Sequence, residues 1–324
     1  MNVLAPTRID PDTRRRPEFI LGTDTRGQTD LDGVLAAAGL NWGLRTVSGS
    51  DGLSVIVDDR EISTFAPERQ LVLRDDNNVV LGMVGDGYQA VPNDEAFAST
   101  AIAAKMGAQY QSAGSSDYGR KAFVTMTLPE AEVRVGGKDV VSFSLLFSTD
   151  HSGGGAVAGR IQGVRQWCTN GATVPLREQM SWSVRHTATA SERLAMVEDT
   201  VRGCLRYAKE FAALGEQLIC APMSKSDYET YINALFPRPD ANAAPAAHTR
   251  YERRHADLMG LFHTAAIQQD SPESAWSAVA AVTEYEQWFR PARSELSRAR
   301  RQLDGDSPRF TARAVTLARE MVGV

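Results

Sequence analysis

The sequence predicts an α+β fold: a curved antiparallel sheet with helices in the N-terminal half, followed by an all-helical C-terminal half. Between residues 28 and 187, β-rich runs alternate with turn compositions rich in Gly, Asp, Asn and Ser. After residue 188 the apolar residues change from a spacing of about two to the helical spacing of about 3.6. We therefore expect a flexible arm at 1–26, a mixed α/β domain at 27–187 and a helical region at 188–324.

The composition is that of an ordinary folded protein, with 324 residues, 43% hydrophobic and 23% charged. No run reaches the roughly 18 to 20 apolar residues that a membrane-spanning helix needs. The N-terminal residues also lack the apolar centre of a secretory signal. We expect a cytoplasmic protein that has no membrane partner.

Cysteine and histidine give no sign of a metal site. The three cysteines, Cys168, Cys204 and Cys220, form no C-x-x-C pair, and the five histidines show no H-E-x-x-H spacing. An odd set of widely spaced cysteines also argues against a disulfide framework. The sequence predicts neither a metal nor a cofactor.

The N-terminal elements follow from local signals. Residues 1–26 are rich in Pro, Asp, Thr and Arg and read as the flexible arm. Asp30 is a good N-cap for a first helix, because apolar residues follow it at helical spacing. Pro92 ends an extended stretch, and Asn93 or Asp94 is expected to cap the next helix. Three β-rich runs lie between these helices, at 42–47, 53–57 and 70–85, the last with a DDNN turn that predicts a hairpin.

Four further runs predict the main sheet, at 108–114, 120–128, 140–149 and 156–170. The Gly-rich TDHSGGG between the last two reads as a hairpin turn, which pairs Phe143–Phe147 with Ala156–Ile161. Gly159 and Gly163 in the last run indicate a bend, a bulge or the close approach of another backbone.

Helical spacing dominates from Thr189 onward, beginning with one helix of about thirty residues. A shorter helix at 224–236 ends before Pro237, and Pro and Ala at 237–250 indicate a linker or ordered loop. Three more helical segments are expected, at about 250–268, 273–289 and 308–322.

The Asp150–His151 pair raises the possibility of a catalytic site. The two residues resemble the orienting acid and the base of a nucleophilic enzyme. Neighbours on a strand point to opposite faces, however, so Asp150 is poorly placed to orient His151. A hydrolase that uses these two residues with His186 stays open as a third hypothesis. The glycines also fail to match a phosphate-binding loop, because no Lys-Ser/Thr pair follows them.

Basic residues offer a different chemistry. On a strand, Trp182 and His186 share one face and Arg185 lies opposite, a mixture that suits base stacking and phosphate contacts; the alternative is a core Trp and a salt-bridged Arg. Arg160 and Arg165 are five apart, so both reach one ligand only if a bulge near Gly159 or Gly163 restores the register. The candidate nucleic-acid-binding residues are Arg120, Lys121, Arg160, Arg165, Arg185 and His186.

Several motifs together resemble the phage/plasmid-like protein family, a domain of unknown function numbered 932. They are LGMVGDGYQAVPNDEAF, STDHSGGGAV, GVRQWCTN and WSVRHT in this order, with AWSAVAAVTEYEQWFRP near the end. The resemblance implies an origin in phages, prophages or plasmids and hence the cytoplasm of a bacterial host. The order of elements is also similar to that of phage single-strand annealing proteins, an analogy at the level of fold.

These observations lead to one expected function and one alternative. We expect a non-enzymatic protein that binds single-stranded DNA and promotes annealing and recombination as a homo-oligomer, with the basic residues holding the DNA backbone. The alternative is a phage-encoded regulator or host-defence antagonist that acts by protein contacts.

Overall fold

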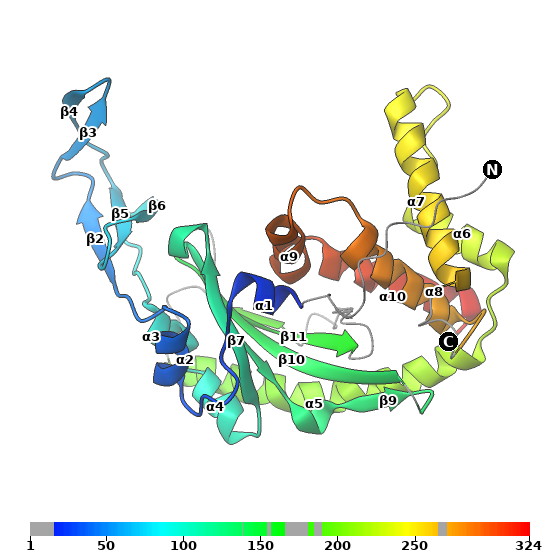
Figure 1. Ribbon diagram of the computed structural model, residues 1–324. Coiled ribbons are helices and arrows are strands. Elements are labelled where there is room, and N and C mark those ends of the chain that lie inside the picture. The colour runs from blue at the N-terminus through cyan, green and yellow to red at the C-terminus, as the bar shows by residue number, and fades with distance from the viewer. Residues whose placement is uncertain (1–15, 138, 154–156, 166–180, 185–189, 265–270) are drawn as a thin grey trace.

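The computed structural model describes residues 16–137, 139–153, 157–165, 181–184, 190–264 and 271–324. Figure 1 shows a central sheet with the long helix α5 along one face, a β arm that projects at one end and a group of helices at the other. This is the α+β arrangement predicted: antiparallel sheets lie in the N-terminal half and helices in the C-terminal half.

The main sheet has seven strands, all antiparallel, in the order β1-β7-β8-β10-β11-β12, with β9 paired to β10. The predicted antiparallel pairing of these two strands is confirmed, with Leu145 opposite Ile161 and Phe147 opposite Gly159. The register differs from the prediction, because Phe143 lies opposite Gly163, beyond the expected partner range 156–161. The strands are β1 (Thr23–Asp24), β7 (Gln109–Ser116), β8 (Lys121–Thr127), β9 (Val133–Val135), β10 (Asp139–Asp150), β11 (Val157–Arg165) and β12 (Ser181–Val184).

The projecting β arm spans residues 44–85 and contains two smaller sheets. The predicted hairpin is present as β5 and β6, which the DDNN turn joins. β4 was not predicted, because REIST is exposed throughout and has little apolar alternation. The strands are β2 (Leu44–Ser48), β3 (Leu53–Val57), β4 (Arg60–Thr64), β5 (Arg69–Arg74) and β6 (Val80–Gly85).

Helices supply the rest of the described structure. The N-cap of α2 is confirmed, since Asp30 Oδ1 accepts a hydrogen bond from the Gly33 amide at 2.8 Å. The helices are α1 (Pro17–Leu21), α2 (Leu31–Ala37), α3 (Asn93–Phe97), α4 (Thr100–Lys105), α5 (Ala190–Cys220), α6 (Lys225–Leu235), α7 (Pro245–Thr264), α8 (Ala275–Glu284), α9 (Glu295–Asp304) and α10 (Ser307–Val322). Short turns of other helix types are η2 (Asp117–Gly119), η3 (Pro129–Ala131) and η7 (Tyr285–Phe289).

Three local predictions differ from the structure. Residues 17–24, assigned to the flexible arm, form α1 and β1, and β1 pairs with β7. The expected linker at 237–250 ends early, because Pro245 occupies the first turn of α7 and two alanines follow it. Neither Asn93 nor Asp94 caps α3: its N-cap residue is Pro92, and the Asn93 amide makes long-range contacts instead.

One hydrophobic core joins the two halves of the chain. A single cluster of buried residues runs from Val34 to Ala318 and includes residues of the main sheet and of α5, α6, α7, α8 and α10. On α5, Val197 and Val201 are fully buried beside Leu145 and Phe147 of β10. The mixed region and the helical region therefore fold around a shared interior.

Candidate nucleic-acid interface

The turn between β7 and β8 carries an unusually exposed aromatic side chain. Asp117 and Tyr118 both have left-handed backbones, with φ of 52° and 63°. This conformation costs a residue other than glycine about 1–3 kcal/mol and persists only where its surroundings impose it. The Tyr118 side chain is 82% exposed at the tip. We call residues Asp117–Gly119 the Tyr118 turn.

Arg74 of β5 holds the Tyr118 turn from one side. Its Nη1 donates to the Tyr118 carbonyl at 3.1 Å, and its guanidinium lies 4.5 Å from the centroid of the Trp42 ring. Asp76 accepts from Nε and Nη2 of the same guanidinium, at 2.9 and 2.6 Å. The planar arginine fork thus contacts the turn, Asp76 and the Trp42 ring at once.

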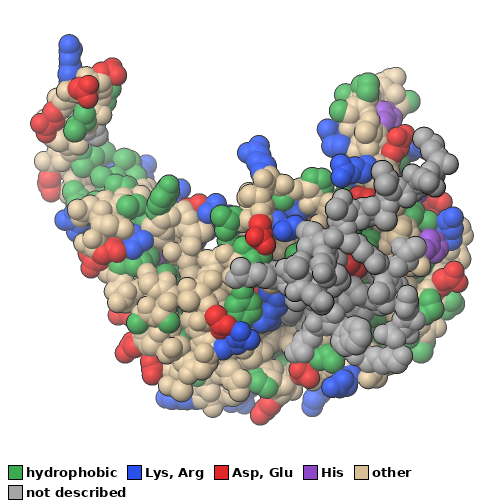
Figure 2. Space-filling view, viewed as in Figure 1, with side chains coloured by type: hydrophobic (Ala, Val, Ile, Leu, Met, Phe, Trp, Pro, Cys, Tyr) green, Lys and Arg blue, Asp and Glu red, His purple; other side chains and the backbone are tan. Residues whose placement is uncertain are grey.

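A second arginine reaches the turn from α9. Arg300 Nη1 lies 3.1 Å from Asp117 Oδ1, and these side chains are 49% and 44% exposed. Arg120, directly after the turn, is exposed and donates from Nε to the Leu81 carbonyl at 2.9 Å. Figure 2 shows that the surface between the β arm and α9 is hollowed, with Lys and Arg side chains as well as some Asp and Glu side chains along it. An exposed aromatic ring with arginines beside it suits the stacking of a base and the binding of phosphates.

The predicted binding residues fall in different places. Arg120 and Lys121 lie at the Tyr118 turn, where Lys121 pairs in register with Asp150. Arg160 lies further along the sheet, opposite Leu146, and its Nε and Nη2 are shielded from solvent. Arg185 and His186 lie outside the described residues.

The bulge that would bring Arg160 and Arg165 together is not there. β11 pairs with β10 in an unbroken register from Ala158 to Arg165, where Arg165 lies opposite Val141. Five positions along a regular strand give alternating faces, so these two arginines occupy positions on opposite faces of the sheet. The condition for both arginines to reach one ligand, a bulge that restores the register, is therefore not met.

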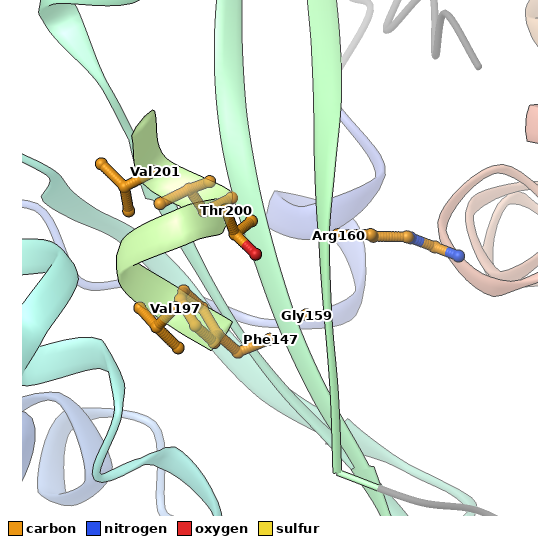
Figure 3. Close-up of a pocket in the computed structure, with 7 residues that line it drawn as sticks. Phe147, Gly159, Arg160, Val197, Thr200 and Val201 are labelled. Carbon is orange, nitrogen blue, oxygen red and sulfur yellow. The ribbon is translucent and has the colours of Figure 1, made fainter. Parts of the chain in front are cut away.

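A small pocket lies between the sheet and α5 (Figure 3). Figure 3 shows Val197, Thr200 and Val201 on one side of it, while the Arg160 side chain extends from β11 away from α5. The lining is otherwise apolar, from Leu145, Phe147, Gly159 and the two valines. This pocket is part of the core packing, and the Arg160 guanidinium belongs to the opposite face.

Asp150 and His151 take separate partners. His151 is fully buried; its Nε2 lies 3.0 Å from Asn93 Oδ1, and its ring contacts Trp42 edge-on at 5.4 Å between centroids. Asp150 Oδ1 instead accepts from the amide and hydroxyl of Ser152, at 2.9 and 2.5 Å. The geometry gives His151 a structural role at the end of β10.

Tyr88 lies near enough to Asp150 to feel its charge. Burial, with the negative charge of Asp150 as a second cause, raises the pKa of Tyr88 to about 12. The phenol therefore stays protonated, and hence neutral beside the carboxylate, to a higher pH than an ordinary tyrosine.

Sequence reasoning missed Tyr118, Arg74 and Arg300. The signal for Tyr118 was a large aromatic inside SSDYG, a stretch that otherwise has only turn residues. Arg74 and Arg300 come from elements far away in the sequence, so no local pattern links them to the turn. Among the described residues there is no group of three or more His, Cys, Asp or Glu that could hold a metal ion. Nor does that part of the chain include a helix long and apolar enough to cross a bilayer.

Comparison with known proteins gives a family. No curated protein and no solved structure matches the chain. The family model described as "Domain of unknown function (DUF932)" matches residues 80–304, a range that includes the Tyr118 turn, the main sheet from β7 onward and α9. Because this match spans more than half of the chain, the protein belongs to the DUF932 family.

Proposed function

We propose that this protein binds single-stranded DNA at the Tyr118 turn and promotes annealing without chemical catalysis. The observation that carries the proposal is the Tyr118 ring, 82% exposed, with Arg74 and Arg300 in contact with its turn and Arg120 beside it. Every base has a π-face, so an exposed ring binds single strands with little regard to sequence, at about 1–3 kcal/mol per stacked base.

Such a surface would promote annealing because it leaves the pairing edges of the bound bases free. Arginine contacts hold the phosphates, and stacking holds one face of a base, while the pairing edges stay open to a second strand. Arg120 and Lys121 add positive charge at the same end of the sheet. We further propose that the protein works as a homo-oligomer in the cytoplasm of a bacterial host, in keeping with the function expected from the sequence.

One observation favours the alternative, a phage-encoded regulator or host-defence antagonist that binds protein. The β arm exposes Ile56 and Phe65 to 78% and 69%, and exposed apolar groups of this kind are typical of protein interfaces. The two functions differ in their response to salt, because phosphate contacts weaken steeply as salt rises.

The test is the binding of a dye-labelled oligo(dT) measured by fluorescence anisotropy across a salt series. We expect Tyr118→Ala to weaken binding by about 5- to 150-fold, the equivalent of one lost stacked base, and Tyr118→Phe to bind normally. Arg120→Ala with Lys121→Ala should reduce the salt slope by about 0.7 per lost phosphate contact. Arg60→Ala, an exposed arginine on β4, is the matched control. The proposal would be overturned if Tyr118→Ala left the affinity for oligo(dT) unchanged and the double variant left the salt slope unchanged.

A further inference from the structure

The inner sheet of the β arm, β2-β5-β6, has one covered and one uncovered face. A Cβ at Gly82 of β6 would lie 2.6 Å from the Ser152 backbone, so the turn after β10 covers the face to which Gly82 belongs. Its neighbour Met83 points to the other face, where it lies in one row with Leu71 and Val47. Met83 is 55% exposed there. We call this uncovered side of the inner sheet the open face.

The open face has a positive charge at the end nearest the body of the molecule. Arg45 of β2 and Val80 of β6 both lie opposite Leu73, so they belong to the open face, and both are exposed. Arg45 Nη2 donates to Asn78 Oδ1 at 2.7 Å, a neutral partner that leaves the charge of the guanidinium uncompensated. The open face is thus an apolar strip that ends in a cation.

The outer ribbon of the arm, β3 and β4, has the complementary chemistry. Val57 and Ile62 share one of its faces and are 48% and 45% exposed. Asp58 and Asp59 form its turn; both are exposed and left-handed, with φ of 49° and 59°. The ribbon is therefore an apolar strip that ends in two carboxylates. A two-stranded ribbon alone is marginally stable in water, so it gains from a surface on which to pack.

The ribbon and the inner sheet also match in length. Figure 1 shows the ribbon at the outer end of the arm and the inner sheet nearer the body. β3 and β4 have five residues each, and β2, β5 and β6 have five or six, so each part is about 17–20 Å long. Two arms that lie antiparallel about a twofold axis therefore place the ribbon of each copy on the open face of the other. The acidic turn of one copy then meets Arg45 of the second, at the body end of its open face.

We propose that the β arms of two copies of this chain pack against each other in this antiparallel way and form a homodimer. This inference rests on the homo-oligomer of the proposed function and names its interface. A second copy is the favoured occupant because one arm carries both complementary surfaces, so a twofold axis makes each contact twice. Arg74 alternates with Leu73 and points to the covered face, which leaves the Tyr118 turn open to DNA in the dimer.

The first test measures molar mass by sedimentation equilibrium over a range of protein concentrations. We expect a dimer whose dissociation constant rises about tenfold or more in Met83→Asp. Met321→Asp, at an exposed methionine on α10, should leave the constant unchanged. A parent chain that stays monomeric, or a dimer that the folded Met83→Asp variant leaves intact, would overturn the proposal.

A double-mutant cycle tests the charge pairing. Asp58→Asn with Asp59→Asn removes both charges and keeps residues that tolerate a left-handed turn. This variant should raise the dissociation constant of the dimer by up to about fivefold, as expected for an exposed ion pair. Arg45→Gln should have a similar effect in the parent and none in the asparagine variant. Fully additive effects would show that Arg45 and the acidic turn do not meet.

Cross-linking tests the arrangement with both aspartates in place, and it stays decisive if Met83→Asp fails to fold. In chains with Cys168→Ser and Cys220→Ser, Arg60→Cys beside the turn is mixed with Val80→Cys at the body end of the open face. These positions lie at opposite ends of one arm, so a short bismaleimide joins them only between copies. We expect cross-links in the mixture and none between two Arg60→Cys chains. Cross-links between two Arg60→Cys chains, or from either cysteine to another protein of a cell extract alone, would overturn the proposal.

Oligo(dT) binding separates this inference from the proposed function. If the parent chain is monomeric and binds oligo(dT), the β-arm interface fails and the DNA-binding function stands. If the parent forms the dimer and does not bind oligo(dT), the DNA-binding function fails and the β-arm interface stands.

Discussion

Asn93 Oδ1 lies 3.0 Å from Nε2 of His151, and the same amide donates through Nδ2 to the Leu40 carbonyl at 2.9 Å. This buried amide joins the start of α3, the end of β10 and the segment after α2. Replacing Asn93 with Ala leaves both partners without it, and each unsatisfied buried group costs about 1–3 kcal/mol. With two such groups, we expect urea unfolding to show a loss of about 2–6 kcal/mol in the free energy of unfolding for Asn93→Ala. Asn41→Ala, at an exposed position, should stay within about 0.5 kcal/mol of the parent.

Glu18 makes stability depend on pH. Burial raises the pKa of this carboxyl above its ordinary 4.5, despite the Arg16 guanidinium 3.3 Å away. The folded state therefore holds the proton more tightly than the unfolded state. Stability should fall as pH rises from 4.5 through the raised pKa, and stay at the lower level above it. Melting curves of the parent and of Glu18→Gln across pH check this: the variant should lose that dependence. Parallel pH profiles would contradict the prediction.

Arg74 is expected to matter through its shape as well as its charge. Lysine keeps the charge but cannot contact Asp76 through two nitrogens, hold the Tyr118 carbonyl and cover the Trp42 ring at once. Arg74→Lys should therefore speed amide exchange at residues 117–119 and weaken oligo(dT) binding, with little change in melting temperature. Arg45→Lys, on the neighbouring strand β2 with a single contact to Asn78, is the control. Unchanged exchange in the turn would show that Arg74 does not fix it.

Gly114 sets how closely α1 approaches the sheet. A Cβ at this position would lie 2.5 Å from Gly22 Cα and 2.8 Å from the Leu21 carbonyl oxygen. Neither atom belongs to a flexible side chain, so the segment that carries α1 must shift, at about 1–3 kcal/mol. Gly114→Ala should make residues 17–24 more sensitive to limited proteolysis. Gly85→Ala, where a Cβ meets nothing within 4 Å, should not. Equal cleavage in the two variants would contradict the expectation.

Local signals predicted most of the fold. Asp30 caps α2 because its side-chain oxygen satisfies the otherwise unpaired amide three residues later and so stabilises the first turn. The β5–β6 and β10–β11 hairpins followed from turn residues between β-rich runs. α9 was missed because its buried residues, such as Ala299 and Leu303, are too few to mark an apolar stripe among arginines.

The contacts of the candidate site could not be predicted from the sequence, because they join residues that are far apart in the chain. Asn93 looked like a helix cap, since a short polar side chain before a helix usually serves its own backbone. Its partners Leu40 and His151 are 53 and 58 residues away, and the sequence gives no hint of them. Arg300 likewise meets Asp117 only because α9 folds back over the sheet. The alternation of side chains along a strand did predict that Arg160 and Arg165 lie on opposite faces in the absence of a bulge.

The β3–β4 ribbon forms the outer part of the β arm, and backbone hydrogen bonds join the two chain segments that lead into it and out of it. The Gly49 amide donates to the Arg69 carbonyl at 2.7 Å, and the Ala66 amide donates to the Gly49 carbonyl at 2.8 Å. β3 and β4 lie beyond this closure and, among the strands that the structure describes, pair with each other alone. Changes in their length or composition leave β2, β5 and β6 in place, because the backbone closes below them. The β3–β4 ribbon can therefore change in sequence while the β2-β5-β6 sheet that carries it keeps its structure.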